Sequence, residues 1–360
     1  MKQHVVSILL RAQSPISHIA ETFGNTAIAQ TRMVRQWDGT MARVPEITGA
    51  TIRHKLRAAA SMAELFAVGF AEGAGAGGPE GKLSEAGLRL LFNGGMVTGR
   101  GDAGNIRLEQ YRELVENVPH MALLGGCADN RTIPGKIQVS PATLLCRESR
   151  TDFEASEHRW MLTSSKPVAE GGPTVAEVVR GALAQTCRAS LEEFQRVRMD
   201  STLDPKMRAL MTGEATAATE RRLTASAEAS REGDAIAREA TKSTMMPRRA
   251  EALVQGSLLY TGFTAITHTE LEEDALKVMV TQALARLGPG GDDWLGGMGR
   301  EGFGKITVVE GRWHQPTPTA QEAEGTDLAL LADPALGERF RGHLRERAGQ
   351  VLDYLKRVNA

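Results

Sequence analysis

The stretch WLGGMGREGFGKITVV, residues 294 to 309, decides whether a nucleotide-binding fold is expected, because it matches two phosphate-binding sequence patterns, one of them incompletely. Gly297 to Gly302 spells the dinucleotide fingerprint, and Gly299 to Lys305 spells a P-loop whose final hydroxyl residue is replaced by Ile306. Both patterns require a strand before the glycines and a helix after them, so that the helix N-terminus faces the phosphates. Here the predicted order is helix, glycines, strand, so neither nucleotide-binding fold is expected.

Hydrophobic patterns around this loop predict four strands and two helices. The strands are rich in β-branched and apolar residues without a helical period, and they cover residues 4–11, 135–148, 256–269 and 306–311. The helices carry apolar stripes at spacings of three and four, and they cover residues 51–69 and 270–287. The resulting βαββαβ order predicts an α+β fold of the RRM-like or ferredoxin-like type with large insertions.

Composition excludes several classes of protein. The chain has 360 residues, 41% of them hydrophobic, and a formal net charge of −1, so a chain-wide basic field is absent. Its three cysteines lack metal-site spacing, and no metal or other cofactor is expected. The opening run VVSILL is too short for a signal peptide or a membrane span, so we expect a cytoplasmic protein that does not contact a membrane.

Local charge favours a polyanionic ligand. Residues 1 to 60 contain eight Lys or Arg against three acidic residues, although a solvated face would also explain this surplus. Three of the basic residues, Arg53, Lys55 and Arg57, lie in the first turns of a predicted helix and oppose its macrodipole, which a bound polyanion would compensate. Eight glycines between residues 288 and 304 indicate close approach of an extended nucleic-acid strand, or a loop that only joins helix to strand.

Four motifs together resemble a known family. They are ILLRAQSPISHIAE (8–21), VPEITGATIRHKLR (44–57), LLGGCADNRTIPGKIQVSPA (123–142) and LGGMGREGFGKITV (295–308). In this order they resemble the backbone subunit of the RAMP superfamily of CRISPR-associated proteins, which binds guide RNA (crRNA) in Cascade-like effector complexes of antiviral defence. The similarity is greatest to the type IV subunit, and the type I-D subunit is also similar.

The resemblance implies a hand-shaped subunit with an RRM-like palm, fingers and a thumb. The implied parts are the first half of the palm (1–69), an insertion or finger region with a palm strand near 135–148 (70–173), a mostly helical insertion including the thumb (174–255), the second half of the palm with the glycine-rich loop (256–311), and a C-terminal tail and helix (312–360). Such subunits multimerise as a helical filament along guide RNA and display its bases to target DNA or RNA. The implied partners are guide RNA, target nucleic acid, further copies of the chain and other effector subunits.

Candidate RNA-binding residues come from two sources. By position in the family motifs, the resemblance implies phosphate contacts at Arg53 and Arg57 and passage of RNA at Gly297, Gly299 and Gly302. Charge and aromatic placement adds Arg32, Arg35, Lys55, Lys136, Arg300, Phe303 and Lys305. Met245 and Met246 are candidates for a thumb wedge between bases, or for ordinary packing at a strand start.

Catalysis is not expected. In the type III relatives an aspartate before the basic helix cleaves target RNA, whereas this chain has Gln30 near that place and its first aspartate is Asp38. The alternative is a RAMP-superfamily endoribonuclease that processes CRISPR RNA with His18 as general base, although His18 is also compatible with a packed turn. A third alternative is a nucleotide-dependent enzyme.

Overall fold

The computed structural model describes residues 1–23, 26–36, 38–69, 83–95, 104–186, 195–199, 248–299, 302–315, 326–328 and 337–358. These residues belong to two compact units. The larger contains residues 1–18, 30–194 and 253–360, and the smaller contains residues 19–29 and 195–252. The larger unit combines an antiparallel sheet with helices, which confirms the predicted α+β class.

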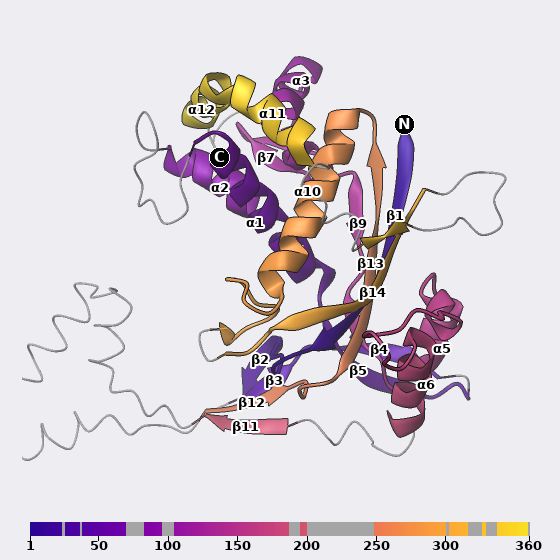
Figure 1. The fold of residues 1–360 in the computed structure, drawn as a ribbon. Helices are drawn as coiled ribbons and strands as arrows, with labels where there is room; N and C mark the ends of the chain where they lie inside the picture. The colour runs from indigo at the N-terminus through magenta and orange to yellow at the C-terminus, as the bar shows by residue number, and fades with distance from the viewer. Residues whose placement is uncertain are drawn as a thin grey trace, which may run out of the picture. The chain divides into compact units, whose positions relative to one another are not determined.

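A central sheet organises the larger unit (Figure 1). Its order is β15 (Thr326–Asp327), β14 (Ile306–His314), β1 (Lys2–Ala12), β13 (Leu258–Thr267), β10 (Ala142–Leu144), β5 (Met41–Ile47) and β4 (Thr31–Arg35), and β9 (Ile137–Val139) also pairs with β13. All pairings within this sheet are antiparallel. The four predicted strands therefore lie in the spatial order last, first, third, second.

Strand β1 is buried on both faces, as its mostly apolar sequence without alternation predicts. Successive side chains point to opposite faces, so Ile8 and Leu10 enter one hydrophobic core while Leu9 enters another. The first core is covered by α1 (Gly49–Ala67) and α10 (Glu270–Leu287), and the second by α5 (Arg150–Ala155), the 3₁₀ helix η1 (Arg159–Leu162) and α6 (Val175–Thr186).

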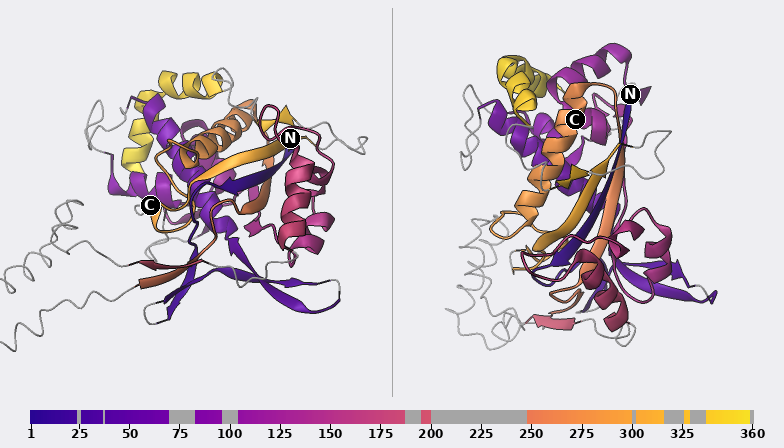
Figure 2. Two further views of the ribbon diagram at one scale, coloured as in Figure 1. Left: turned by 60° about the horizontal axis from the view of Figure 1, so that its bottom comes forward. Right: turned by 45° about the vertical axis from the view of Figure 1, so that its right-hand side comes forward.

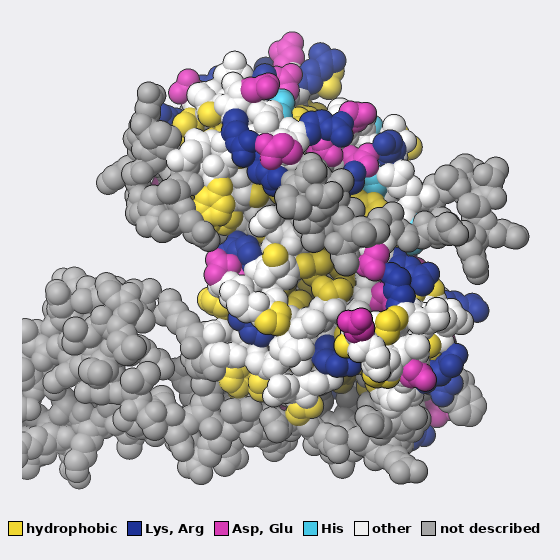
Figure 3. Space-filling model, viewed as in Figure 1, with side chains coloured by type: hydrophobic (Ala, Val, Ile, Leu, Met, Phe, Trp, Pro, Cys, Tyr) yellow, Lys and Arg dark blue, Asp and Glu magenta, His cyan; other side chains and the backbone are white. Residues whose placement is uncertain are grey.

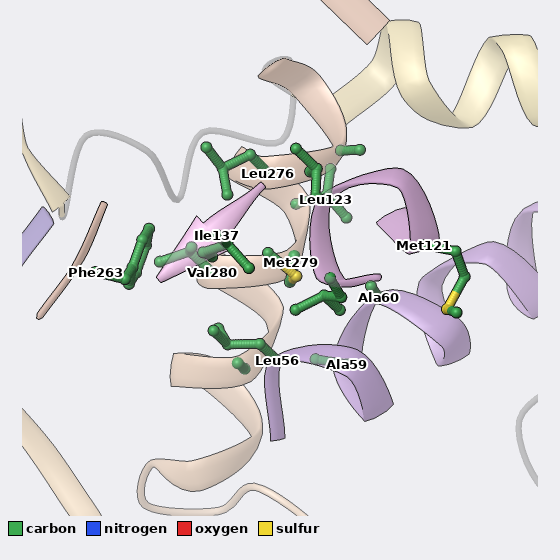
Figure 4. Packing of buried hydrophobic residues seen from close by; sticks show 14 of the residues in the cluster. Leu56, Ala59, Ala60, Met121, Leu123, Ile137, Phe263, Leu276, Met279 and Val280 are labelled. Atoms are coloured by element: carbon green, nitrogen blue, oxygen red, sulfur yellow. The ribbon is translucent and has the colours of Figure 1, made fainter. Parts of the chain in front are cut away.

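Helices α1 and α10 pack against each other on the sheet (Figure 4). Ala59 and Ala60 let α1 approach α10 on the side of Met279, whereas Val280 of α10 lies beside Ile137 and Phe263 of the sheet. Each helix begins at a threonine cap: the Thr48 hydroxyl accepts from the Thr51 amide, and Thr269 caps α10 in the same way. The predicted bounds of α10, residues 270–287, are confirmed.

The remaining helices and strands are short. In the larger unit they are α2 (Glu85–Asn93), α3 (Leu108–Asn117), α4 (Pro119–Leu124), α11 (Glu338–Glu346), α12 (Ala348–Arg357) and a small sheet of β6 (Gly104–Asn105), β8 (Arg131–Ile133) and β7 (Gly126–Ala128). The smaller unit is a sheet in the order β11 (Gln195–Met199), β12 (Arg248–Ala252), β3 (Thr26–Ala29), β2 (Ile19–Phe23). In the described part of the chain, none of the helices combines the length and apolar character that crossing a bilayer requires.

Three features differ from the sequence-based expectation. The strand expected at 135–148 is divided into β9 and β10 at Ser140–Pro141, because proline has no amide hydrogen for the ladder. The single helix expected within 312–360 is two helices, α11 and α12. Within 174–255, expected to be mostly helical, the described residues form α6 at one end and the strands β11 and β12.

Candidate nucleic-acid interface

The start of α1 lies beside the glycine-rich loop. Lys55 Nζ is 2.6 Å from Asp293 Oδ1 and 5.3 Å from the centroid of the Trp294 ring. From the other end of the loop, Lys305 Nζ donates to the carbonyl oxygens of Gly291 at 2.7 Å and Asp293 at 2.6 Å. Both lysines were expected to contact RNA. Within the fold, Lys55 links α1 to the loop, and Lys305 links the two ends of the loop to each other. Their charge is largely committed within the fold.

The glycine-rich loop runs back along the segment that follows β1. Gly304 N donates to Pro15 O at 2.8 Å, and Gly297 N donates to Ser17 O at 2.6 Å. Gly296 has a φ of +84°, and a Cβ at this position would overlap Ser17 O. Close approach within the fold therefore explains part of the glycine content, where an RNA strand was expected to explain it.

The predicted loop residues have different surroundings. A Cβ on Gly299 would overlap the Trp294 ring, so this glycine makes room for tryptophan. Gly302 has a φ of +85°, and a Cβ built on it meets no heavy atom of the described residues within 4 Å, while a Cβ on Gly297 meets Ser17 O at 3.5 Å. The backbone at Gly297 and Gly302 thus remains open to a ligand. Phe303 is buried, so we remove its ring from the candidate contacts.

Arg53 and Arg57 extend toward the C-terminal end of α4. Arg53 donates to Leu124 O, and Arg57 Nη2 donates to Gly125 O at 2.8 Å. The carbonyl end of a helix carries partial negative charge, so it compensates the basic residues at the start of α1. The sequence had suggested a bound polyanion for this role. Carbonyl oxygens from a distant helix supply at least part of it.

The same two arginines still carry unneutralised charge. Neither has an ion pair within the residues that the structure describes. Burial and then the positive charge of Arg53 lower the pKa of Arg57 to about 10, and burial lowers the pKa of Arg53. Arg57 Nε is buried and has no hydrogen-bond partner among the described residues. Two desolvated cations side by side favour an anion nearby.

Glycines around these arginines were missed by the sequence-based reasoning as part of the site. A Cβ on Gly94 would approach Arg57 Cζ to 2.9 Å, and a Cβ on Gly135 would overlap the Arg53 guanidinium. Gly135 lies within the motif 123–142 and begins the strand expected at 135–148, but neither observation marked it as part of a binding site. A cluster of glycines there was the available signal, but which side chains it makes room for depends on the tertiary structure.

The other basic candidates separate into paired and free residues. Arg32 forms ion pairs with Glu46, at 3.3 Å, and with Asp152, while Lys136 Nζ is 2.6 Å from Glu272 Oε1. We therefore withdraw Arg32 and Lys136 as primary phosphate contacts, because their charges are neutralised. Arg35 is exposed and has no ion pair within the described residues. The remaining candidates, Arg300, Met245 and Met246, lie outside the described residues.

His18 supports the start of α1. The amide of Thr48 donates to His18 Nε2 at 3.3 Å, and burial lowers the pKa of the imidazole. The amide of Gln30 donates to His18 O at 2.6 Å, so Gln30 lies next to this histidine. One ring nitrogen is thus occupied by backbone, as expected of a packed turn. The described residues contain no group of three or more His, Cys, Asp or Glu side chains arranged to hold a metal ion.

Comparison with known proteins adds a structural likeness. No family model matches the chain, and no curated protein matches it. A chain of a solved structure entitled "Type IV-B CRISPR Complex" is 17% identical, with a TM-score of 0.44, over 89% of this chain and 93% of that one. The chain is similar to a CRISPR-complex subunit.

A second likeness is to "Crystal structure of Thermofilum pendens Csc2", which is 12% identical with a TM-score of 0.38, over 98% of this chain and 89% of that one. A CRISPR complex is the assembly that the sequence motifs predict. Because both TM-scores are below 0.5, we infer the function from the chain's own residues and motifs.

Proposed function

We propose that the chain is a non-catalytic backbone subunit that multimerises along CRISPR guide RNA, binds its phosphates and leaves its bases free for target pairing. In such assemblies base pairing recognises sequence, while the protein recognises the backbone. The observation that carries this proposal is the pair of half-buried arginines, Arg53 and Arg57, without an ion pair in the described part of the chain. A phosphate between them would restore charge balance.

The sheet supports an RRM-like palm. A ferredoxin-like βαββαβ unit places its four strands in the order 4-1-3-2 with both helices on one face. The order β14, β1, β13, β9/β10, with α1 after β1 and α10 after β13, has this form. We propose that residues 1–69 and 256–311 are the two halves of the palm, that 70–173 carries finger insertions, that the thumb lies in 174–255, and that 312–360 is a C-terminal extension.

The distribution of charge agrees with a localised groove. Figure 3 shows Lys and Arg intermixed with Asp and Glu on the visible face, without a broad field of one sign. Subunits stacked side by side would repel one another if each carried a strong net charge, and this chain carries −1. Positive charge without a paired carboxylate is then needed only where RNA passes.

The absence of cleavage is also part of the proposal. The backbone amide of Gln30 lies next to His18, and the side-chain amide of Gln30 is uncharged, so it cannot take the 2′-hydroxyl proton as a carboxylate could. The alternative, His18 as the general base of a processing nuclease, is weakened because the Thr48 amide occupies Nε2. Incubating the purified chain and His18→Ala with repeat-containing RNA would detect processing if it occurred.

The binding test measures the affinity of the purified chain for a labelled single-stranded RNA over a series of salt concentrations. Arg53→Ala and Arg57→Ala should each weaken binding whatever the RNA sequence. Each should also make the negative slope of log K against log salt shallower by about 0.7. Arg89→Ala is the control, because Arg89 is exposed and paired with Glu85 within α2. Unchanged slopes in both test variants, with wild-type binding intact, would show that the phosphate site is elsewhere.

Assembly is tested by sedimentation with RNAs of increasing length. A backbone subunit should sediment as complexes whose size grows with RNA length, and should not form them without RNA. Discrete dimers that do not respond to RNA would contradict the scaffold role.

A further inference from the structure

The hairpin formed by β4 and β5 has two different faces. On one face Val34 and Val44 are buried together with Cys146, and Arg32 is neutralised by Asp152 and Glu46. This face is therefore packed against the rest of the larger unit. Strand β4 is the last strand of the central sheet, so its outer edge has no neighbouring strand in the described chain (Figures 1 and 2).

The opposite face is open and has an unusual composition. Met33 and Met41 are 53% and 54% exposed, and Arg35 and Arg43 are exposed beside them. The register pairs Met33 with Arg43 and Arg35 with Met41. The two arginines thus lie on one diagonal of the hairpin, about 7–8 Å apart, and the two methionines lie on the other. We call these four residues the Met/Arg face.

The positive charge of the Met/Arg face favours binding of an anionic partner. Neither Arg35 nor Arg43 has an ion pair or a side-chain hydrogen bond within the described part of the chain, in contrast to Arg32 on the buried face. The Met/Arg face itself contains no carboxylate. Two free guanidinium groups at this spacing can contact one polyanionic strand at two points.

The two exposed methionines favour a polyanion that also presents flat apolar surfaces. An exposed methionine is flexible and polarizable, so it adapts to flat apolar surfaces such as the faces of unpaired bases. A duplex hides its base faces by stacking, whereas a single strand presents them. A two-stranded ribbon of this kind is also a shape that proteins use to contact nucleic acids.

We propose that the Met/Arg face binds an unpaired segment of nucleic acid, with Arg35 and Arg43 on phosphates and Met33 and Met41 against bases. The proposal rests on the proposed function and adds a second contact to it. Strand β5 ends at Ile47 and α1 begins at Gly49, so the base of the hairpin lies next to the start of α1. One nucleic-acid strand can therefore meet the arginine pair of α1 and continue along the hairpin.

Two double variants test the Met/Arg face against a short labelled RNA. Arg35→Gln/Arg43→Gln should make the negative slope of log K against log salt shallower by about 1.4, twice the value for one phosphate contact on a single strand. Met33→Thr/Met41→Thr should leave the slope unchanged, weaken single-strand binding roughly five- to tenfold, and leave binding to duplex RNA of the same length unchanged. The control is Arg89→Gln/Arg112→Gln, two exposed arginines in α2 and α3.

The outcomes separate this inference from the proposed function. If the wild-type chain does not bind RNA, both are wrong. If Arg53→Ala weakens binding but the hairpin variants behave like the control, only the Met/Arg face is wrong. If the hairpin variants weaken binding while Arg53→Ala and Arg57→Ala do not, the α1 site is wrong and the Met/Arg face stands. If the hairpin variants abolish self-association without changing RNA affinity, the face binds another copy of the chain, and the proposal is overturned.

Discussion

His158 offers a prediction whose size can be worked out from the structure. The side chain is 3% exposed, and its ring lies 5.3 Å from that of Tyr260 in the core beneath α5, η1 and α6. Burial lowers the pKa of His158 from 6.5 to about 4, although the charge of Asp152 opposes this. One pKa unit corresponds to about 1.4 kcal/mol, so the difference amounts to about 3 kcal/mol.

The sign follows from proton linkage. Well above pH 6.5 the imidazole is neutral in both the folded and the unfolded state, so it contributes no pH dependence to the free energy of unfolding there. As the pH falls from 6.5 toward 4, the unfolded chain binds a proton at His158 that the folded chain does not bind. The folded state should therefore lose about 3 kcal/mol through this one group across that range.

The variant His158→Leu removes the titrating group, and it also removes Nδ1, which is buried without a hydrogen-bond partner. The free energy of unfolding is measured by urea denaturation at both pH values. The variant's value minus the wild-type value should increase by about 3 kcal/mol when the pH is lowered from 7.5 to 4. The exposed His268 provides the control variant His268→Leu. A difference between His158→Leu and wild type that is the same at both pH values would refute the assignment of a buried, neutral imidazole.

A buried Glu–His contact and a Glu–Lys cluster allow two further predictions. Glu64 and His120 are wholly buried, with Oε2 and Nδ1 2.7 Å apart. His120→Ala should lower the free energy of unfolding, measured by urea denaturation, by about 3–5 kcal/mol, and adding Glu64→Met should recover much of this. If the second substitution recovers nothing, the loss is not caused by leaving the Glu64 carboxyl buried without its partner. Burial opposes ionisation of Glu273, but hydrogen bonds from Lys2 and Lys277 lower its pKa to about 2. The stability that it contributes is present above about pH 4.5 and is lost toward pH 2, so the destabilisation by Glu273→Gln should disappear over that range.

The elements that the sequence predicted well are those whose burial pattern is local. The apolar stripe and threonine cap of α10 lie within one continuous stretch, and its bounds of 270 and 287 follow from them. The mostly apolar sequence of β1, which lacks polar alternation, likewise indicates burial on both faces. The β4–β5 hairpin was not predicted, because its glycine and proline residues indicated only turns, and its Met33 and Met41 are exposed, so the sequence lacks a regular buried pattern.

What the sequence by itself determined was the order of the elements around the glycine loop and the presence of three basic residues at the start of α1. The tertiary structure decided the partner of each charge. Arg53 meets Leu124, 71 residues away, and Lys55 meets Asp293, 238 residues away. Arg32 and Arg35, three positions apart, end on opposite faces of one hairpin, the first paired and the second free. Periodicity is a property of neighbours in the chain, whereas the neutralisation of a long charged side chain depends on which distant groups the fold brings within reach.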